Sequence, residues 1–299
     1  MRLCFRVRLL CYREAFSSSV PVTMTNLNRA VVLITGATGG FGRHMTHQFM
    51  AAGSRVILTD LDAGGLATLK SEFDTSDNPV LACIAADLST ADGCQALFDA
   101  VETTDLQPDI LINNAGIAVS GRIDNVPRDR WEALMQINLL APMRLCDLFV
   151  PQMIKRGSGH IVNISSVAGW IGAPGMASYC AAKFGLRGYS ECLSADVAEF
   201  SIKVSVVYPY FSRTPILDSE RFGYKERMAI PDEMVTDPAD VVAAIIKGVK
   251  RNRLHIFPDK MARRIHYMKR YIPWLIPLMS RRMQQRMIQS DSLQQDLND

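Results

Sequence analysis

Short apolar runs alternate with amphipathic stretches from Ala30 to about residue 258, and this alternation limits the possible folds more than any other feature of the chain. Runs of four to six apolar residues fit strands that are buried on both faces, and the stretches between them have helical periodicity. The predicted strands are 30–34, 55–59, 80–85, 110–113, 160–165, 203–208 and 254–257. The predicted helices are 41–52, 64–72, 92–103, 128–153, 178–199 and 238–251. The pattern predicts an α/β fold with a doubly wound sheet of about seven parallel strands flanked by helices.

One domain accounts for residues 30–258, because no linker, repeat or low-complexity tract interrupts them. Residues 209–236 break the rhythm, with prolines at 209, 215 and 231. This stretch is too long for a simple turn and follows the carboxyl end of a strand, where ligands bind in such sheets. It is therefore interpreted as a substrate loop.

Composition excludes several classes of protein. Hydrophobic residues make up 48% of the chain, which is ample for a buried core, and the net charge of +3 is too small to indicate nucleic acid as a partner. The seven cysteines are odd in number and form no Cys-x-x-Cys pair, so neither a disulfide framework nor a metal site is predicted. No apolar run reaches the length of a membrane-spanning helix.

Residues 1–29 form an N-terminal extension outside the predicted domain. Residues 1–23 hold four arginines, one acid and the serines 17–19, a composition typical of a mitochondrial presequence. The other interpretation is an upstream start codon, with Met24 as the first residue of the functional chain.

A glycine-rich turn joins the first predicted strand to the first helix. Gly36 permits a tight turn, Gly40 allows the backbone to approach a phosphate, and Gly42 allows the helix to pack closely on the strand. The free N–H groups at the start of the helix would face the phosphates. The position of the turn predicts a Rossmann-type domain that binds the pyrophosphate of a dinucleotide.

Asp60 ends the second predicted strand, eighteen residues after Gly42. Its carboxylate could accept hydrogen bonds from the adenosine ribose and would repel a 2′-phosphate, which favours NAD over NADP. The alternative is a helix N-cap, because Asp60 and Asp62 both precede a helix.

Further motifs follow this turn in a fixed order: Asp87-Leu88, Asn113-Asn114-Ala115-Gly116, Asn138, Ile164-Ser165-Ser166 and Tyr179-Cys-Ala-Ala-Lys183. With Thr35-Gly-x-x-x-Gly-x-Gly42, they make residues 30–258 resemble the short-chain dehydrogenase/reductase family. The resemblance implies an oxidoreductase that moves a hydride between a nicotinamide and an alcohol or carbonyl carbon. The catalytic residues it implies are Tyr179, Lys183, Ser166 and Asn138.

The side chains suit these roles chemically. A carbonyl that accepts hydride develops negative charge on oxygen and needs a proton donor, which Tyr179 can be. A phenol has an ordinary pKa of about 10, so a phenolate near neutral pH needs a cation, and Lys183 lies one turn further along the helix. Ser166 would hydrogen-bond the substrate oxygen. In the family, an asparagine in the preceding helix holds a water that links the lysine to solvent, and Asn138 matches it; a buried amide that kinks the helix is the alternative.

The resemblance also implies the cofactor contacts. It assigns the adenine contact to Asp87, packing of the cofactor against the sheet to Asn114, and the nicotinamide ribose to Lys183. Thr214 matches a threonine that contacts the carboxamide, although Tyr210 stands where the family usually has glycine after Pro209. The other expected cofactor-binding positions in these motifs are Gly36, Thr38, Gly40, Phe41, Gly42, Asp60, Leu88, Ala115, Gly116 and Tyr179.

The substrate is expected to be apolar, such as a steroid, a retinoid or a long-chain alcohol or aldehyde, because Trp170, Ile171 and Met176 lie between the serine and the tyrosine. One alternative is an NAD(P)H-dependent reductase of acyl or sugar-like carbonyls. Another is a cofactor-binding scaffold without catalysis. Residues 128–153 and 178–199 resemble the helices through which the family forms dimers and tetramers, so a homodimer or homotetramer is expected.

Residues 259–299 form a basic amphipathic C-terminal segment. Between 260 and 290 there are eight lysines and arginines and no acids, around an apolar run at 271–279. Basic and aromatic residues together are typical of a segment that lies on an anionic membrane surface. The alternative is an arm that packs on a dimer partner or over the substrate loop. The sequence thus predicts a cytoplasmic protein that attaches to a membrane surface, with a mitochondrial location as the second interpretation.

Overall fold

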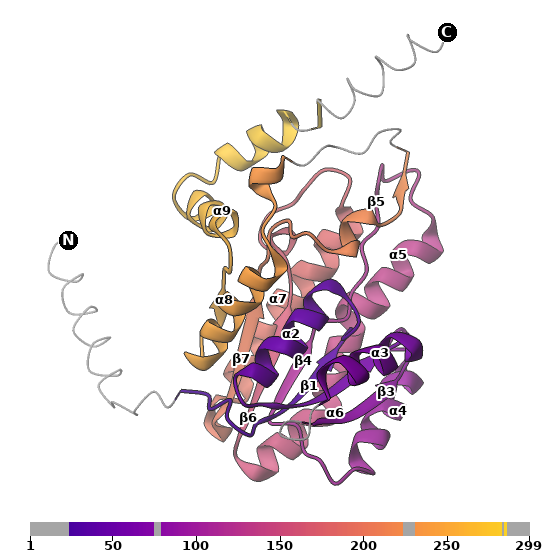
Figure 1. The fold of residues 1–299 in the computed structure, drawn as a ribbon. Helices are drawn as coiled ribbons and strands as arrows, with labels where there is room; N and C mark the ends of the chain where they lie inside the picture. The colour runs from indigo at the N-terminus through magenta and orange to yellow at the C-terminus, as the bar shows by residue number, and fades with distance from the viewer. Residues whose placement is uncertain (1–23, 75–78, 224–230, 283, 286–299) are drawn as a thin grey trace, which may run out of the picture.

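A seven-stranded parallel sheet forms the centre of the molecule in a computed structural model, which describes residues 24–74, 79–223, 231–282 and 284–285 (Figure 1). The strand order is β3-β2-β1-β4-β6-β7-β9, which confirms the predicted doubly wound sheet. Its strands are β1 (Val31–Thr35), β2 (Arg55–Asp60), β3 (Val80–Ala85), β4 (Ile110–Asn113), β6 (Gly159–Ile164), β7 (Ile202–Val207) and β9 (His255–Ile256).

Helices cover both faces of the sheet, because alternate side chains of each strand point to opposite sides. Val32 and Ile34 of β1 face one helical layer, while Val31 and Leu33 face the other. The first layer consists of α2 (Gly40–Ala51), α3 (Ala63–Phe73) and α8 (Pro238–Lys250). The second consists of α4 (Ala91–Glu102), α6 (Ala141–Arg156) and α7 (Ala177–Asp196).

The long helix before β6 is not regular throughout. It begins as α5 (Arg128–Met135), continues through the π-helical turn η1 (Gln136–Leu140) and ends as α6. By length and composition this helix, Arg128–Arg156, could cross a membrane, and it is the one such helix in the part of the chain that the structure describes. However, Leu145 and Phe149 pack in the core against the sheet, as expected for a core helix of a globular domain.

The substrate loop has structure that the sequence did not predict. Residues Ser120–Gly121 form β5, which pairs in parallel with β8 (Arg221–Phe222) inside the loop. Two short 3₁₀ turns, η4 (Pro215–Asp218) and η5 (Asp232–Met234), flank this pairing. The loop is therefore tied to the segment that follows β4, at the carboxyl edge of the main sheet. Residues 224–230 of the predicted loop lie outside the described residues.

The packed structure extends beyond residues 30–258 at both ends. Leu27 is buried in the core beside β1, and α9 (Lys260–Tyr271) packs on the domain through Ala262 and Ile265. Residues 1–23, on which the presequence interpretation rests, lie outside the described residues.

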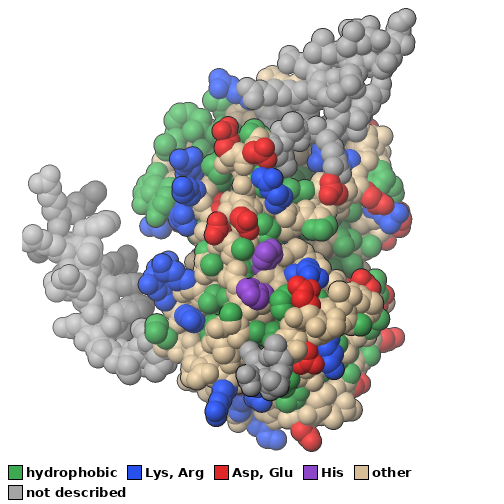
Figure 2. Space-filling model, viewed as in Figure 1, with side chains coloured by type: hydrophobic (Ala, Val, Ile, Leu, Met, Phe, Trp, Pro, Cys, Tyr) green, Lys and Arg blue, Asp and Glu red, His purple; other side chains and the backbone are tan. Residues whose placement is uncertain are grey.

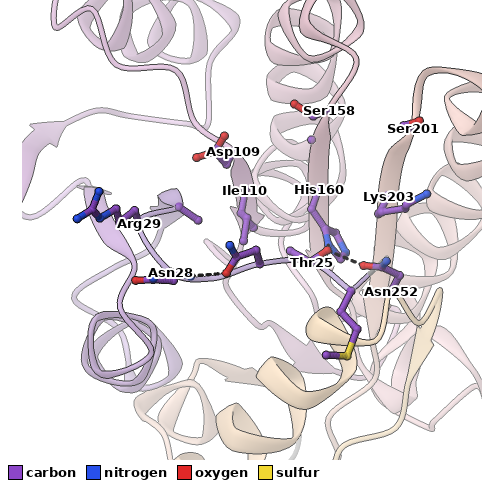
Figure 3. Close-up of a pocket in the computed structure, with 14 residues that line it drawn as sticks. Thr25, Asn28, Arg29, Asp109, Ile110, Ser158, His160, Ser201, Lys203 and Asn252 are labelled. Carbon is purple, nitrogen blue, oxygen red and sulfur yellow. Dashed lines mark hydrogen bonds between the residues drawn. The ribbon is translucent and has the colours of Figure 1, made fainter. Parts of the chain in front are cut away.

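At the opposite, amino edge of the sheet, Thr25 ties the start of the described chain to the domain. Its hydroxyl lies 2.9 Å from Nδ1 of His160 and donates to Oδ1 of Asn252 at 2.5 Å (Figure 3). Nε2 of His160 lies 2.9 Å from the hydroxyl of Ser205. A surface pocket of about 330 Å³ opens beside these residues, on the side away from the strand ends that carry the family motifs.

Burial of His160 predicts acid sensitivity. Its side chain is 1% exposed, and desolvation lowers its pKa from 6.5 to about 3. Below pH 6.5 the unfolded chain binds a proton that the folded chain excludes, so the free energy of unfolding should fall as the pH drops from about 6.5 towards 3, by up to ~1.4 kcal/mol per pH unit. Urea titrations at pH 6 and pH 4 should show a flatter dependence for His160→Gln than for the unmodified chain. Parallel slopes would exclude His160 as the cause.

Candidate active site

The motifs converge at the carboxyl edge of the sheet, where the strand order reverses between β1 and β4. Side chains and loops that follow neighbouring parallel strands meet at such a reversal, which is where doubly wound sheets bind their ligands. The glycine-rich turn follows β1, Asp60 ends β2, Asn114 follows β4 and Ser166 follows β6. The topology alone therefore brings together residues that are up to 130 positions apart in the sequence.

Two glycines of the turn have no room for a side chain. Gly36 has a φ of +64°, and a Cβ there would lie 2.8 Å from Cα of Ala115. A Cβ on Gly42 would lie 2.1 Å from the carbonyl oxygen of Gly36. The turn is thus compact enough that its backbone, and not side chains, forms the surface at the start of α2.

That surface suits an anion. Helix α2 has Gly39 at its N-cap with no side-chain hydrogen bond, and its first turn has no acidic residue. The N–H groups of such a helix start, among them that of Phe41, attract a phosphate. Thr214 of the substrate loop lies against the same turn, since a Cβ on Gly40 would be 2.5 Å from Cγ2 of Thr214. The residues present therefore fit the pyrophosphate of a dinucleotide.

Asp60 contacts the turn. Its Oδ2 accepts hydrogen bonds from the backbone N–H and the hydroxyl of Thr38, at 2.9 and 2.7 Å. Its Oδ1 accepts only the N–H of Asp62, at 3.3 Å. The N-cap of α3 is Asp62, which accepts from the N–H of Gly65. Asp60 is therefore free of the capping role, and one carboxylate oxygen keeps most of its capacity to accept hydrogen bonds.

Asn114 joins the turn to the end of β4. Its side-chain amide donates to the carbonyl oxygens of Thr35 and Gly36, at 2.9 and 3.0 Å. The hydroxyl of Thr35 in turn accepts the N–H groups of Asn114 and Ala115. These bonds fix the glycine-rich turn against the end of β4.

Asp87 and Leu88 follow β3 and differ in exposure. Asp87 is exposed, and a hydrogen bond from Ser89 lowers the pKa of its carboxyl. Leu88 is buried with Cys94 and Leu97 of α4. Asp87 is thus placed to meet a ligand at the sheet edge, whereas Leu88 supports it from below.

Tyr179 and Lys183 lie one turn apart on α7, and both are buried. Nζ of Lys183 is 5.7 Å from the centroid of the Tyr179 ring and donates to the carbonyl oxygen of Ile164 at 2.9 Å. Burial raises the pKa of Tyr179 to about 12, although a hydrogen bond with Ser166 acts in the opposite direction and lowers it. Burial also lowers the pKa of Lys183 to about 8, so the lysine remains largely protonated at pH 7. The pair holds a neutral phenol beside a cation.

Ser166 caps the short turn η2 (Val167–Gly169), where its hydroxyl accepts the N–H of Ala168 at 3.1 Å. The same hydroxyl lies 3.4 Å from the carbonyl oxygen of Pro209. The serine therefore bridges the turn after β6 and the turn after β7, with its hydroxyl also within reach of Tyr179.

Asn138 sits in the π-helical turn and is fully buried. Its Oδ1 accepts the N–H of Ile117 at 2.9 Å, and its Nδ2 donates to the carbonyl oxygen of Ile117 at 2.8 Å. Gly116 lies alongside: a Cβ there would be 3.1 Å from Oδ1 of Asn138 and 3.7 Å from Nζ of Lys183. Both atoms of the amide thus help to hold the loop after β4 next to the lysine.

Asp259 is a site residue that the sequence analysis missed. It is 4% exposed; its Oδ1 accepts the N–H of Ala262 as the N-cap of α9, and its Oδ2 accepts the N–H of Tyr210 at 2.9 Å. The backbone at Tyr210, where this sequence lacks the glycine usual in the family, is therefore held by a carboxylate. The N-cap position before α9 was the one signal for it in the sequence.

Trp170 and Ile171, expected beside the substrate, lie beneath α9 instead. They pack with Tyr208, Phe257 and Ile265. Met176, also expected there, packs around Tyr179 together with Ala173, and other segments contribute Ile117, Ala118, Val119, Leu134 and Phe222. The surroundings of the phenol are apolar, and they come from the segment after β4, from α5, from the substrate loop and from residues 173–176.

The chain is similar to known proteins over most of its length. The family model for short chain dehydrogenases matches residues 30–224. Human epidermal retinol dehydrogenase 2 is 29% identical, over 85% of this chain and 82% of its own.

Solved structures of the same family share the fold. A short-chain dehydrogenase from Sphingobium yanoikuyae in complex with NADPH is 28% identical, with a TM-score of 0.72, and the match covers 83% of this chain and 95% of that one. A Burkholderia phymatum short chain dehydrogenase/reductase in complex with NAD is 24% identical, with a TM-score of 0.73, and covers 84% of this chain and 96% of that one.

Proposed function

The chain belongs to the short-chain dehydrogenase/reductase family, and from this premise we propose that it interconverts an alcohol and a carbonyl with NAD(H). The observation that carries the proposal is the meeting of Tyr179, Lys183 and Ser166 beside a glycine turn shaped for a dinucleotide. When bound, the nicotinamide supplies or accepts the hydride.

The protein side chains move the proton. In reduction, the phenol of Tyr179 gives its proton to the substrate oxygen, and the carbon of that carbonyl has gained the hydride, so an alcohol forms. Ser166 donates a hydrogen bond to the same oxygen. The phenolate left on Tyr179 is stabilised by the Lys183 cation until a proton returns. Oxidation runs through the same groups in reverse.

Asn138 is proposed as a positioning residue. The two hydrogen bonds with Ile117 fix the π-helical turn beside Lys183, and the backbone of that turn would hold a water that links the lysine to solvent. Such a turn leaves a carbonyl without its usual helical partner, which makes this possible.

An apolar substrate is proposed, of the steroid, retinoid or long-chain class. The apolar side chains around Tyr179 support it, among them Met176 and Phe222, as does the similarity to a protein named retinol dehydrogenase. Association into a homodimer or homotetramer, and a cytoplasmic location at a membrane surface reached through residues 260–290, belong to the same proposal. Residues 286–290 lie outside the described residues.

The test is formation of NADH from NAD over a panel of alcohols: retinol, a hydroxysteroid, decanol, a 3-hydroxyacyl thioester and a sugar alcohol. We expect one of the first three to give the highest kcat/KM. Preference for the acyl thioester or the sugar would favour reduction of acyl or sugar-like carbonyls as the function. A folded protein that binds NAD and oxidises none of them, and reduces none of the matching carbonyls, would be a scaffold.

Asp60 should make NAD the better cofactor. Asp60→Ala removes an acceptor for the ribose and the charge that repels a 2′-phosphate, so the ratio of kcat/KM for NAD to that for NADP should fall by about tenfold or more. Asp60→Asn keeps an oxygen that can accept the hydrogen bonds from Thr38 but loses the negative charge. Comparison of the two variants therefore separates the repulsion of the 2′-phosphate from the loss of hydrogen bonds to the turn. A higher kcat/KM with NADP in the unmodified protein would contradict the proposal.

A further inference from the structure

The outward face of α9 and of residues 272–282 combines exposed aromatic and aliphatic side chains with cations. The apolar members are all substantially exposed: Tyr267 (56%), Tyr271 (68%), Ile272 (41%), Trp274 (70%), Leu278 (42%) and Met279 (49%). The exposed cations are Lys260, Arg263, Arg264, Arg270, Arg281 and Arg282. Together these residues are called the C-terminal face. Figure 2 shows hydrophobic side chains bordered by cations at the upper left, where Figure 1 places α9.

This exposure is a property of one side of the helix. Positions 260, 263, 264, 267 and 271 follow helical spacing along the outer side of α9. The inner side carries Ala262 and Ile265, which are buried against Tyr208 and Val167. The helix is therefore already seated on its own domain, and the outer side is what remains for a partner.

The arrangement of the outer side is ordered. The rings of Tyr267 and Tyr271 stack with centroids 6.4 Å apart, and the guanidinium of Arg270 lies 5.8 Å from the Tyr271 ring. Pro273 and Trp274 then form a turn before the helical residues 275–282. Tyrosine and tryptophan with adjacent arginines are the side chains that settle at the boundary between lipid headgroups and acyl chains.

The cations of the C-terminal face have no ion-pair partner among the described residues. No acidic residue occurs between 260 and 285, and no ion pair within the described ranges involves one of its cations. A two-fold contact between copies would set this face against itself and bring like charges together. An anionic surface neutralises all six cations at once. Charge complementarity therefore favours an anionic bilayer over a second copy of the chain.

We propose that the C-terminal face binds the surface of an anionic lipid membrane, with its aromatic side chains in the headgroup region and its arginines on the lipid phosphates. The apolar stretch at 271–279 is too short to span a bilayer and is interrupted by Pro273 and Pro277, so the segment rests on the bilayer surface. In Figure 1 the face and the substrate loop lie at the same end of the domain. An apolar substrate would thus reach the site from the membrane side. This consequence rests on the proposed function, whereas binding of the face to the membrane does not.

The test is co-sedimentation of the full chain with vesicles of phosphatidylcholine containing 30 mol% phosphatidylserine, at low salt. Two variants remove the proposed contacts: Trp274→Ser, and Arg263→Glu with Arg264→Glu. Their matched controls are Ile123→Ser, an aliphatic side chain that is 82% exposed elsewhere, and Lys155→Glu with Lys247→Glu, which changes the net charge equally. All substituted positions are exposed, and all five proteins are compared at equal circular dichroism. Truncation at 258 is unsuitable because it would uncover Trp170 and Tyr208.

We expect the full chain and both controls to pellet with anionic vesicles and to stay in solution with phosphatidylcholine alone. The two face variants should pellet at least fivefold less, and high salt should release the full chain, since the attraction is screened. Absence of pelleting by the full chain, or equal pelleting of all five proteins, would overturn the proposal. So would an oligomer that Trp274→Ser disperses without any vesicle binding, because the face would then join copies. Binding needs no turnover, so its failure is distinguishable from failure of the proposed oxidoreductase activity.

Discussion

Replacement of Tyr179 by phenylalanine should abolish turnover while NAD still binds. The substitution keeps the buried ring and removes only the hydroxyl, which hydrogen-bonds Ser166 and which we propose exchanges a proton with the substrate oxygen. Loss of a general acid lowers kcat by about 100- to 10,000-fold. The measurement is NADH formation with the best alcohol of the panel, together with a calorimetric titration of NAD.

Tyr189→Phe is the matched control, because Tyr189 lies on the same helix and also uses its hydroxyl, in a hydrogen bond with Cys146. This variant should keep kcat within about twofold, since the loss of one internal hydrogen bond costs only ~1 kcal/mol of stability. If Tyr179→Phe retained more than roughly a tenth of the rate, it would fall outside the range of a general-acid role. Another group would then carry the proton.

Gly42→Ala should damage both folding and cofactor binding. The new Cβ would lie 2.1 Å from the carbonyl oxygen of Gly36 and 2.6 Å from that of Ala37, and both are backbone atoms that cannot rotate away. Overpacking of this kind costs about 1–3 kcal/mol or more. Because the shift falls on the turn that faces the phosphates, the dissociation constant for NAD should also rise by about tenfold or more, which corresponds to ~1.4 kcal/mol.

Gly188→Ala, on α7, should stabilise the protein, in contrast to Gly42→Ala. A Cβ at Gly188 meets nothing within 4 Å, and the residue is exposed on α7. Alanine in an open helical position should raise the free energy of unfolding by up to ~1 kcal/mol and leave NAD binding unchanged. Equal stability changes for the two variants, measured by urea unfolding, would show that the close packing at Gly42 is not what requires glycine there.

The sheet could be predicted because its signals are local. The central strands β1, β4 and β6 are buried on both faces, so an apolar run of four to six residues marks them regardless of their neighbours. The predicted strand 80–85 agrees with β3 in both limits, and 110–113 agrees with β4. By contrast, β5 and β8 have two residues each, which is too short for any periodicity, and only their pairing across the substrate loop creates them.

The polar groups show the same division. From the sequence, Asp60 and Asp62 are both candidates for the N-cap of α3. In the structure Asp62 is the N-cap, because the carboxylate of Asp60 accepts hydrogen bonds from Thr38 instead. Trp170 was expected at the substrate because it is close to Ser166 and Tyr179 in sequence. In the fold, Trp170 packs with Ile265 of α9, whereas Met176 and residues between 117 and 134 pack around Tyr179.

The sequence by itself determined the order of strands and helices, the glycine turn and the positions of Ser166, Tyr179 and Lys183, because spacing within one turn or one helix follows from backbone geometry. Only the tertiary structure decided which groups they meet. The carboxylate of Asp259 accepts the N–H of Tyr210, which is 49 residues away in the sequence. The amide of Asn138 forms both of its hydrogen bonds with the backbone of Ile117, and one side of α9 is buried while the other is exposed. Such contacts depend on the distance between elements after packing, and no local pattern of residue types encodes that distance.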